Sequence, residues 1–373
     1  MHMKGLVGAA VLMALLAALV VYSPADSPWS GVKERLEEAG GTTYEETATQ
    51  GERMALFLSN LLGENLQADE NSGSAPGAGT VETEVPKGTG DWEMAGVSLG
   101  DSVEEMEAAR GEAKDVQAGN YSFDWHIYYK DKYEQYAQYG VQDGRVVALY
   151  SNQQTWQDAE GNGWGTGRDT IRETYGESIE TVARGNIRTE TNEQQQGVYE
   201  VEDGYATFFY DIHEENRVNA LLLVDKEVER NSSFYAGESE EVRESYEQLV
   251  WHLTNAQRVQ LGRDTLAYND SVAAVARAHS ENMAENQFFD HVNPEGQNPF
   301  DRLERDGIGY MQAAENIASG QRSPLYAAAG WMNSYEGHRE AMLGNYDGLG
   351  VGVAFDEENR PFYTQNFVSP SRE

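Results

Sequence analysis

The chain contains no cysteine among its 373 residues. This absence excludes disulfide bonds, thiolate nucleophiles and zinc-thiolate sites at the same time. The fold must therefore be stabilised by the packing of apolar side chains. At roughly 150 residues per domain, a chain of this length predicts two domains with connecting segments.

Acidic residues far outnumber basic ones, with 63 Asp and Glu against 27 Lys and Arg and a formal net charge of −36. Such a charge repels nucleic acids and anionic lipid headgroups, so we expect no nucleic acid among the partners. An excess of solvated carboxylates also keeps a protein soluble in concentrated salt. The composition therefore suggests a halophilic or alkaliphilic habitat.

An apolar segment near the start predicts export. Lys4 precedes an unbroken apolar run, Gly5–Tyr22, which is followed by Ser23–Ala25. A secretory h-region is usually about 7–15 residues long, whereas a membrane-spanning helix needs about 20. Because Ser23–Ala25 is a poor cleavage site, residues 1–25 are predicted to be an uncleaved anchor, with a signal peptide as the alternative. Either way, we expect the remainder to be extracellular, membrane-anchored or secreted.

Residues 26–91 are mostly polar and predict no domain. A short juxtamembrane helix is expected around residues 54–62, where apolar side chains recur at helical spacing. Residues 67–91 are small and acidic, with Pro and Gly, and they lack the apolar surface that would offset the entropy of ordering. This part is predicted to be a flexible acidic linker.

Residues 92–228 contain a faint internal repeat, which predicts a duplicated α+β unit. A shift of 65 residues aligns positions of the same character, namely Gly100, Met106, Gly111 and Glu112 with Gly165, Ile171, Gly176 and Glu177. In each copy a helix is expected first and strands afterwards, with hairpin turns near residues 143–144 and 203–204. The polar residues 229–241 are predicted to be a second linker.

Residues 242–373 predict an α+β domain in which helices cover a sheet. A first helix is expected to end near Gly262, and a second begins at Asn269 or Asp270. Ser323 and Pro324 are typical of the start of a third helix. The chain closes with a hairpin that turns at residues 357–359.

Three polar residues on separate segments of this domain predict a preformed cleft. His291 follows the end of the second helix in a turn made by Asn, Pro and Gly, and His338 opens a short helix. Glu315 lies in a half-buried segment of small residues, where a carboxylate needs an imidazolium or a metal as its partner. His279 lies on the apolar face of its helix and is predicted to be a buried core histidine instead.

The chain has no HExxH or other local metal-binding spacing, so a metal site would have to be assembled from distant segments. The three polar residues could equally tie their loops together by hydrogen bonds. The residues alone leave both interpretations open.

Residues 245–368 resemble the CAP domain, the superfamily of cysteine-rich secretory proteins, venom antigens and plant pathogenesis-related proteins, in its bacterial SCP-like form. The resemblance is carried, in order, by LTNAQR, ARAHSENMAENQFFDH, AENIASG, WMNSYEGHR and YTQNF. It implies an α-β-α sandwich whose cleft holds two histidines and two acidic residues and, in several members, a divalent metal. Residues 92–228 are similar to the CAP-associated N-terminal domain of Gram-positive envelope proteins, judging by GVSLGDSVEEM, FDWHIYY, YGVQDGRVVALYSN and GRDTIRETYGE.

The resemblance assigns a role to each site residue. By motif, His291 and His338 correspond to the two histidines, and Glu315 to the acid before Asn316. Many relatives have Trp-x-x-Glu where this chain has Ser334, which removes one charged ligand and weakens a metal site. Glu336 is the candidate replacement for that acid.

The leading hypothesis is a binding or structural module of the cell envelope, for a lipid, glycan or protein ligand. Its cleft comprises His291, Glu315, Asn316, Ser334, Glu336 and His338. The alternative is a metal-assisted hydrolase, directed at proteins or cell wall, in which His291, Glu315 and His338 hold a weakly bound divalent metal such as zinc. We expect binding rather than catalysis, because the cleft contains no recognisable nucleophile. Membrane contact is expected only through the N-terminal segment.

Overall fold

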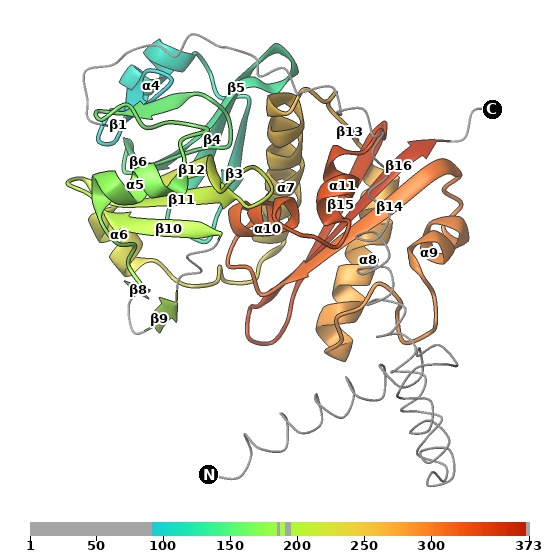
Figure 1. The fold of residues 1–373 in the computed structure, drawn as a ribbon. Coiled ribbons are helices and arrows are strands. Elements are labelled where there is room, and N and C mark those ends of the chain that lie inside the picture. The colour runs from blue at the N-terminus through green and yellow to red at the C-terminus, as the bar shows by residue number, and fades with distance from the viewer. Residues whose placement is uncertain (1–91, 185–186, 191–194, 371–373) are drawn as a thin grey trace, which may run out of the picture. The chain divides into compact units, whose positions relative to one another are not determined.

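The computed structural model describes residues 92–370, except 185–186 and 191–194 (Figure 1). The predicted anchor, juxtamembrane helix and acidic linker of residues 1–91 lie outside the described residues. Among the residues that the structure describes, no helix is long and apolar enough to cross a membrane. The fold is mixed α and β, as predicted, with a sheet domain followed by a helix-covered sheet.

The first domain is built on a seven-stranded antiparallel sheet with the order β10-β11-β12-β6-β5-β4-β3. Its two halves join where β12 pairs with β6, with Leu221 opposite Ser151. The strands are β3 (Asp115–Ala118), β4 (Asp124–Lys130), β5 (Glu134–Gln142), β6 (Arg145–Ser151), β10 (Gln196–Glu200), β11 (Gly204–Asp211) and β12 (Arg217–Asp225). Shorter pieces flank this sheet: β1 (Trp92–Met94), β2 (Val97–Ser98), β7 (Trp156–Asp158), β8 (Thr181–Arg184), β9 (Ile187–Glu190) and the 3-10 turn Asp131–Tyr133.

A helix precedes the strands in each half, which is the order the internal repeat predicts. These helices are α4 (Val103–Arg110) and α5 (Arg168–Tyr175), and their buried side chains join one apolar core. Both helices end at a glycine with positive φ, 81° at Gly111 and 84° at Gly176, and its N–H donates to the carbonyl oxygen four residues earlier. The glycines that reveal the repeat are therefore helix terminators.

The second domain is a four-stranded sheet between helices, the α-β-α sandwich that the resemblance to the CAP domain implies. The strand order is β13-β15-β16-β14, which makes β14 an edge strand among the described residues. Figure 1 shows α8 on one side of this sheet and α7, α10 and α11 on the other. The strands are β13 (Ala267–Tyr268), β14 (Tyr310–Ser319), β15 (Gly348–Phe355) and β16 (Pro361–Pro370). The helices are α7 (Glu240–Gln260), α8 (Asp270–Asn286), α9 (Pro299–Arg305), α10 (Pro324–Met332) and α11 (His338–Leu343).

Two glycines let α8 lie directly on β15. A Cβ atom at Gly350 would come within 2.2 Å of the Ala273 nitrogen, and one at Gly352 within 1.9 Å of the Arg277 nitrogen. These alternate positions face α8, because successive residues of a strand point to opposite sides. The close contact fixes the position of α8, and hence of the chain that follows it.

The helix α7 lies between the two sheets. Leu249 and Leu253 pack in one apolar cluster with aromatic side chains of the N-terminal sheet, whereas Tyr246 and Val250 belong to the core of the second domain. A helix that is apolar on both sides is buried on both sides. The two domains therefore share a core, a contact that the sequence analysis does not predict.

The stretch 229–241, treated above as a linker, is partly helical and packed. It includes the end of α6 (Lys226–Asn231), whose first turn is capped by the Asp225 side chain. Glu229 is buried and lies 3.5 Å from the guanidinium of Arg322. A buried carboxylate needs such a partner, so this connection is tied to the second domain.

The α8–β15 contact generates a stability prediction. Gly352→Ala should destabilise the protein by about 1–3 kcal/mol or more, because the added methyl group meets helix backbone that cannot move aside. Gly330→Ala on α10 is the control: its Cβ meets no atom within 4 Å, so a gain of about 0.4–1 kcal/mol is expected. Urea unfolding of both variants measures the two free energies, and an unchanged midpoint for Gly352→Ala would contradict the close approach.

Candidate functional site

The candidate site is built around the edge strand β14, where the side chains of two consecutive residues point to opposite faces of the sheet. Glu315 points to the α8 side, and its carboxylate lies 3.9 Å from the His279 ring. Asn316 points to the other side, where its amide donates to the carbonyl oxygen of His338 and to Gln365, each at 3.1 Å. One strand thus anchors both histidine-bearing segments.

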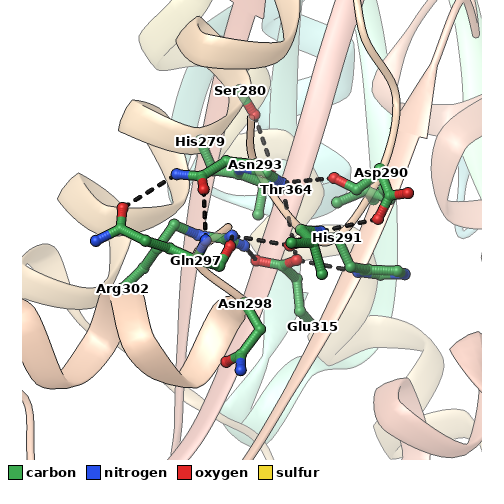
Figure 2. Close-up of polar contacts among 12 residues, drawn as sticks. His279, Ser280, Asp290, His291, Asn293, Gln297, Asn298, Arg302, Glu315 and Thr364 are labelled. Atoms are coloured by element: carbon green, nitrogen blue, oxygen red, sulfur yellow. Dashed lines mark hydrogen bonds and ion pairs between the residues drawn. The ribbon is translucent and has the colours of Figure 1, made fainter. Parts of the chain in front are cut away.

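The carboxylate of Glu315 is the centre of a buried ion-pair network. Its side chain is only 1% exposed. His291 Nδ1 donates to one carboxylate oxygen at 3.0 Å, and Arg302 Nη2 donates to the other at 2.6 Å (Figure 2). Arg302 also donates to the main-chain carbonyls of His291 and Gln297, at 2.8 and 2.9 Å. The network therefore fixes the loop that carries His291.

Arg302 is the partner that the sequence analysis missed, since it considered only an imidazolium or a metal for Glu315. It lies on the short helix α9, where Asn298 caps the first turn and Pro299 occupies the first position. The side chain of Arg302 is 3% exposed. The sequence offered one indication of this partner. Asn298 and Pro299 predict the start of a helix between His291 and Glu315, and Arg302 follows on that helix.

His338 is oriented by a different group. Its Nδ1 lies 2.7 Å from the hydroxyl of Ser334, which also accepts the N–H of Glu336 at 3.0 Å. The ring centres of His291 and His338 are 6.4 Å apart, with 28° between their planes. The structure therefore brings together the predicted residues of both segments, although the side chain of Glu336 lies exposed at the rim.

The partner of His291 fixes the position of its ring proton, whereas the partner of His338 does not. A carboxylate only accepts, so Nδ1 of His291 carries hydrogen and its Nε2 is an acceptor when the ring is neutral. The Ser334 hydroxyl accepts from the Glu336 N–H and has a second lone pair, so it can either donate to His338 Nδ1 or accept from it, and both tautomers of His338 fit this contact. Burial, and secondarily the neighbouring His291, lowers the pKa of His338, so this ring is mainly neutral at pH 7.

The N-terminal domain braces the segment that bears Ser334 and His338. His213 Nε2 donates to the Ser334 carbonyl at 3.0 Å, and the Ile212 N–H donates to the Asn333 side chain at 3.1 Å. Arg339 pairs with Asp211 at 2.8 Å. These contacts come from the end of β11 and the turn after it, which no motif in the sequence analysis indicated.

The residues present do not assemble the expected three-ligand metal set. His291 and Arg302 bond both carboxylate oxygens of Glu315. Of the three expected ligands, the two imidazoles therefore remain to offer a nitrogen to a metal ion. Throughout the described residues, no group of three or more His, Cys, Asp or Glu side chains is placed to hold a metal ion. A weakly bound divalent cation such as zinc stays a prediction.

His279 is a buried core residue, as predicted, and it lies behind Glu315. It is 0% exposed, and its Nε2 donates to the carbonyl oxygen of Asp290 at 3.1 Å. Burial lowers the pKa of His279 to about 4, although the charge of Glu315 partly opposes the shift. This ring is therefore neutral at pH 7 and supports the turn before His291.

Paired histidines at the edge of an α-β-α sandwich, with a buried acid beneath one of them, are the arrangement that the resemblance to the CAP domain implies. Comparisons agree: residues 251–367 match the model of the cysteine-rich secretory protein family, and residues 99–235 match that of the CAP-associated N-terminal domain. The uncharacterized membrane protein YlbC of Bacillus subtilis is 31% identical over 299 residues, which are 72% of this chain and 82% of that protein. The chain belongs to the cysteine-rich secretory protein (CAP) family.

Further relatives share parts of this architecture. The uncharacterized protein YkwD of Bacillus subtilis is 40% identical over 125 residues, 33% of this chain and 47% of that protein. A crystal structure of an extracellular SCP-domain protein from Bacillus anthracis has a TM-score of 0.65 and 27% identity, covering 78% of this chain and 99% of that one. A cysteine-rich secretory protein from Staphylococcus aureus has a TM-score of 0.55 at 17% identity, covering 74% and 95%, which shows the fold alone.

The ion-pair network predicts a large effect of neutralising its acid. Glu315→Gln should cost about 3–5 kcal/mol of stability, because the guanidinium of Arg302 remains buried without a counter-charge. Glu336→Gln, which changes an exposed carboxylate nearby, should stay within about 0.5 kcal/mol of the wild type. Chemical denaturation of both variants decides; equal midpoints would show that Glu315 is not the anchor of the loop.

The pKa of His279 predicts a pH dependence of stability. Between pH 6.5 and 4 the unfolded chain binds a proton at His279 that the folded chain does not, so its contribution is complete above 6.5 and is lost as pH falls through 4. At about 1.4 kcal/mol per pH unit the loss is about 3 kcal/mol. His279→Gln should therefore show a flatter fall in unfolding free energy over this range, and parallel curves would argue against a neutral buried ring.

Proposed function

We propose that the chain is an envelope protein, anchored or secreted, that binds its ligand in the cleft between His291 and His338 without turning it over. The observation that carries this proposal is the pair of imidazoles with ring centres 6.4 Å apart, each held by its own partner. Prepositioned groups lose little entropy on binding, which favours affinity.

The orientation of the rings supports recognition. Nε2 of His291 is an acceptor when its ring is neutral, and Nε2 of His338 accepts or donates according to its tautomer, so together they suit a polar ligand. The side chain of His291 is 44% exposed, so a ligand can reach it from solvent. Phe289 and Tyr335, 54% and 69% exposed, add apolar contact surface on the segments that bear the two histidines.

The hydrogen bonds around Ser334 favour binding over a serine-hydrolase arrangement. In a catalytic triad a carboxylate orients the same histidine that contacts the serine. Here the carboxylate of Glu315 orients His291, whereas Ser334 contacts His338. Ser334 and Glu315 therefore have the same task, which is to hold one ring each.

The location outside the cell is part of the proposal. The apolar run near the N-terminus supports it, as do relatives described as a membrane protein and as an extracellular protein. The net charge of −36 argues against a nucleic acid as ligand. A lipid, a glycan and an envelope protein all remain within the class of ligand.

A retention assay tests this function. The double variant His291→Ala/His338→Ala should lose at least tenfold of its binding to isolated Gram-positive cell envelopes in a sedimentation assay. His126→Ala, which changes a histidine of β4 in the other domain, is the matched control and should bind as the wild type does. Circular dichroism verifies that both variants are folded.

Two results would overturn the proposal. One is equal retention of the double variant and the wild type. The other is turnover of casein or cell-wall fragments that disappears in the double variant, which would establish the hydrolase alternative; the zinc content of the same two preparations would then tell whether a metal takes part.

A further inference from the structure

We propose that the ligand is an extended polypeptide whose main chain pairs with the open edge of β14, between the two histidines. This inference deepens the proposed function and rests on it. In such strand addition, main-chain hydrogen bonds supply affinity and alternate side chains supply specificity.

The direction of the main-chain groups of β14 follows from two hydrogen bonds. The indole of Trp331 donates to the carbonyl oxygen of Ile317 at 2.9 Å, on the side away from β16. The N–H of Gly320, just after β14, donates to the carbonyl oxygen of Pro361 at 3.0 Å and therefore points towards β16. Because main-chain groups alternate along an antiparallel strand, those of Ala313 and Glu315 point the same way as Ile317, away from β16.

The exposure of Glu315 agrees with this assignment. Its side chain is 1% exposed, yet the residue as a whole is partly exposed, so it is mainly the main chain that solvent reaches. Ala313 is also partly exposed, whereas Ile317 is buried. The open stretch therefore runs from Ala313 to Glu315, with Trp331 closing one end and the β-bulge between Tyr310 and Gln312 the other.

Two of the usual devices that protect an edge are absent from β14, although the strand has a β-bulge between Tyr310 and Gln312 and the inward-pointing Glu315. Natural edge strands are commonly shielded by lysine, proline or a covering segment, because unpaired main-chain groups attract other strands. The strand Tyr310–Ser319 contains neither lysine nor proline. Its open stretch carries Glu315, whose buried network holds His291, and it is followed at once by Asn316, which bonds the His338 segment.

The surroundings indicate the character of the peptide. The chain carries a net charge of −36, which favours a basic partner. Exposed apolar side chains are Met311 of β14, at 62%, and Phe289 and Val292 of the segment that bears His291, at 54% and 43%. An extended segment that alternates basic and apolar side chains complements both features.

The test uses the full chain and a fluorescein-labelled, end-blocked KVKVKVK peptide, followed by fluorescence anisotropy. A second peptide has the same side chains but N-methyl groups on its central amides, which removes main-chain donors alone. We expect the wild type to bind the first peptide and to bind the N-methylated one at least tenfold more weakly.

Variants of the protein test the same point from the other side. Ala313→Pro removes an outward N–H without touching the β16 ladder, so binding should fall at least tenfold with an unchanged melting temperature. Ala313→Ser retains the N–H and should bind as the wild type does. Hydrogen exchange should show the Ala313 and Glu315 amides fast in the free protein and slowed by the peptide, with Ala314 and Asn316 slow throughout.

Three outcomes would overturn the inference. Equal binding of the N-methylated peptide means that side chains alone are recognised. No binding of either peptide while envelope retention still depends on His291 and His338 leaves the proposed function and excludes this ligand class. Concentration-dependent dimerisation that Ala313→Pro abolishes means that a second copy of β14 occupies the edge.

Discussion

The site depends on one electrostatic constraint, the burial of the Glu315 carboxylate. An ionised group that is 1% exposed is tolerated only with a compensating charge and full hydrogen bonding. Arg302 supplies the charge, and His291 supplies the second bond. These bonds tie α9 and the loop before it to the edge of the sheet. The interactions that stabilise the buried carboxylate therefore also fix the position of His291.

The position of His338 is set by contacts between the domains. The helix α7 is buried between both sheets. His213 of the N-terminal domain bonds the Ser334 carbonyl, and Asp211 pairs with Arg339 of α11. His338 therefore takes its place from contacts that neither domain provides alone, and the CAP-associated domain has a direct part in placing it.

Sequence reasoning predicted the elements and the three residues that the structure brings close together, but it did not predict what holds them in place. The helix starts at Asn269 and Ser323 and the hairpin before Pro361 could be predicted, because each depends on a few neighbouring residues in the sequence. The pairing of Glu315 with Arg302 joins residues on a strand and a helix whose approach depends on the whole sheet. The shared core around α7 was missed because the spacing of apolar residues shows that a helix is buried, but not which domain covers each of its faces.

The most direct test of the account is nitrogen-15 NMR of the imidazole rings at a pH above their titration. The account predicts a protonated Nδ1 and an unprotonated Nε2 in the neutral ring of His291, because the Glu315 carboxylate can only accept a hydrogen bond. In Glu315→Gln this preference of His291 should weaken. A wild-type His291 that samples both tautomers freely would contradict the claim that the buried carboxylate orients this ring.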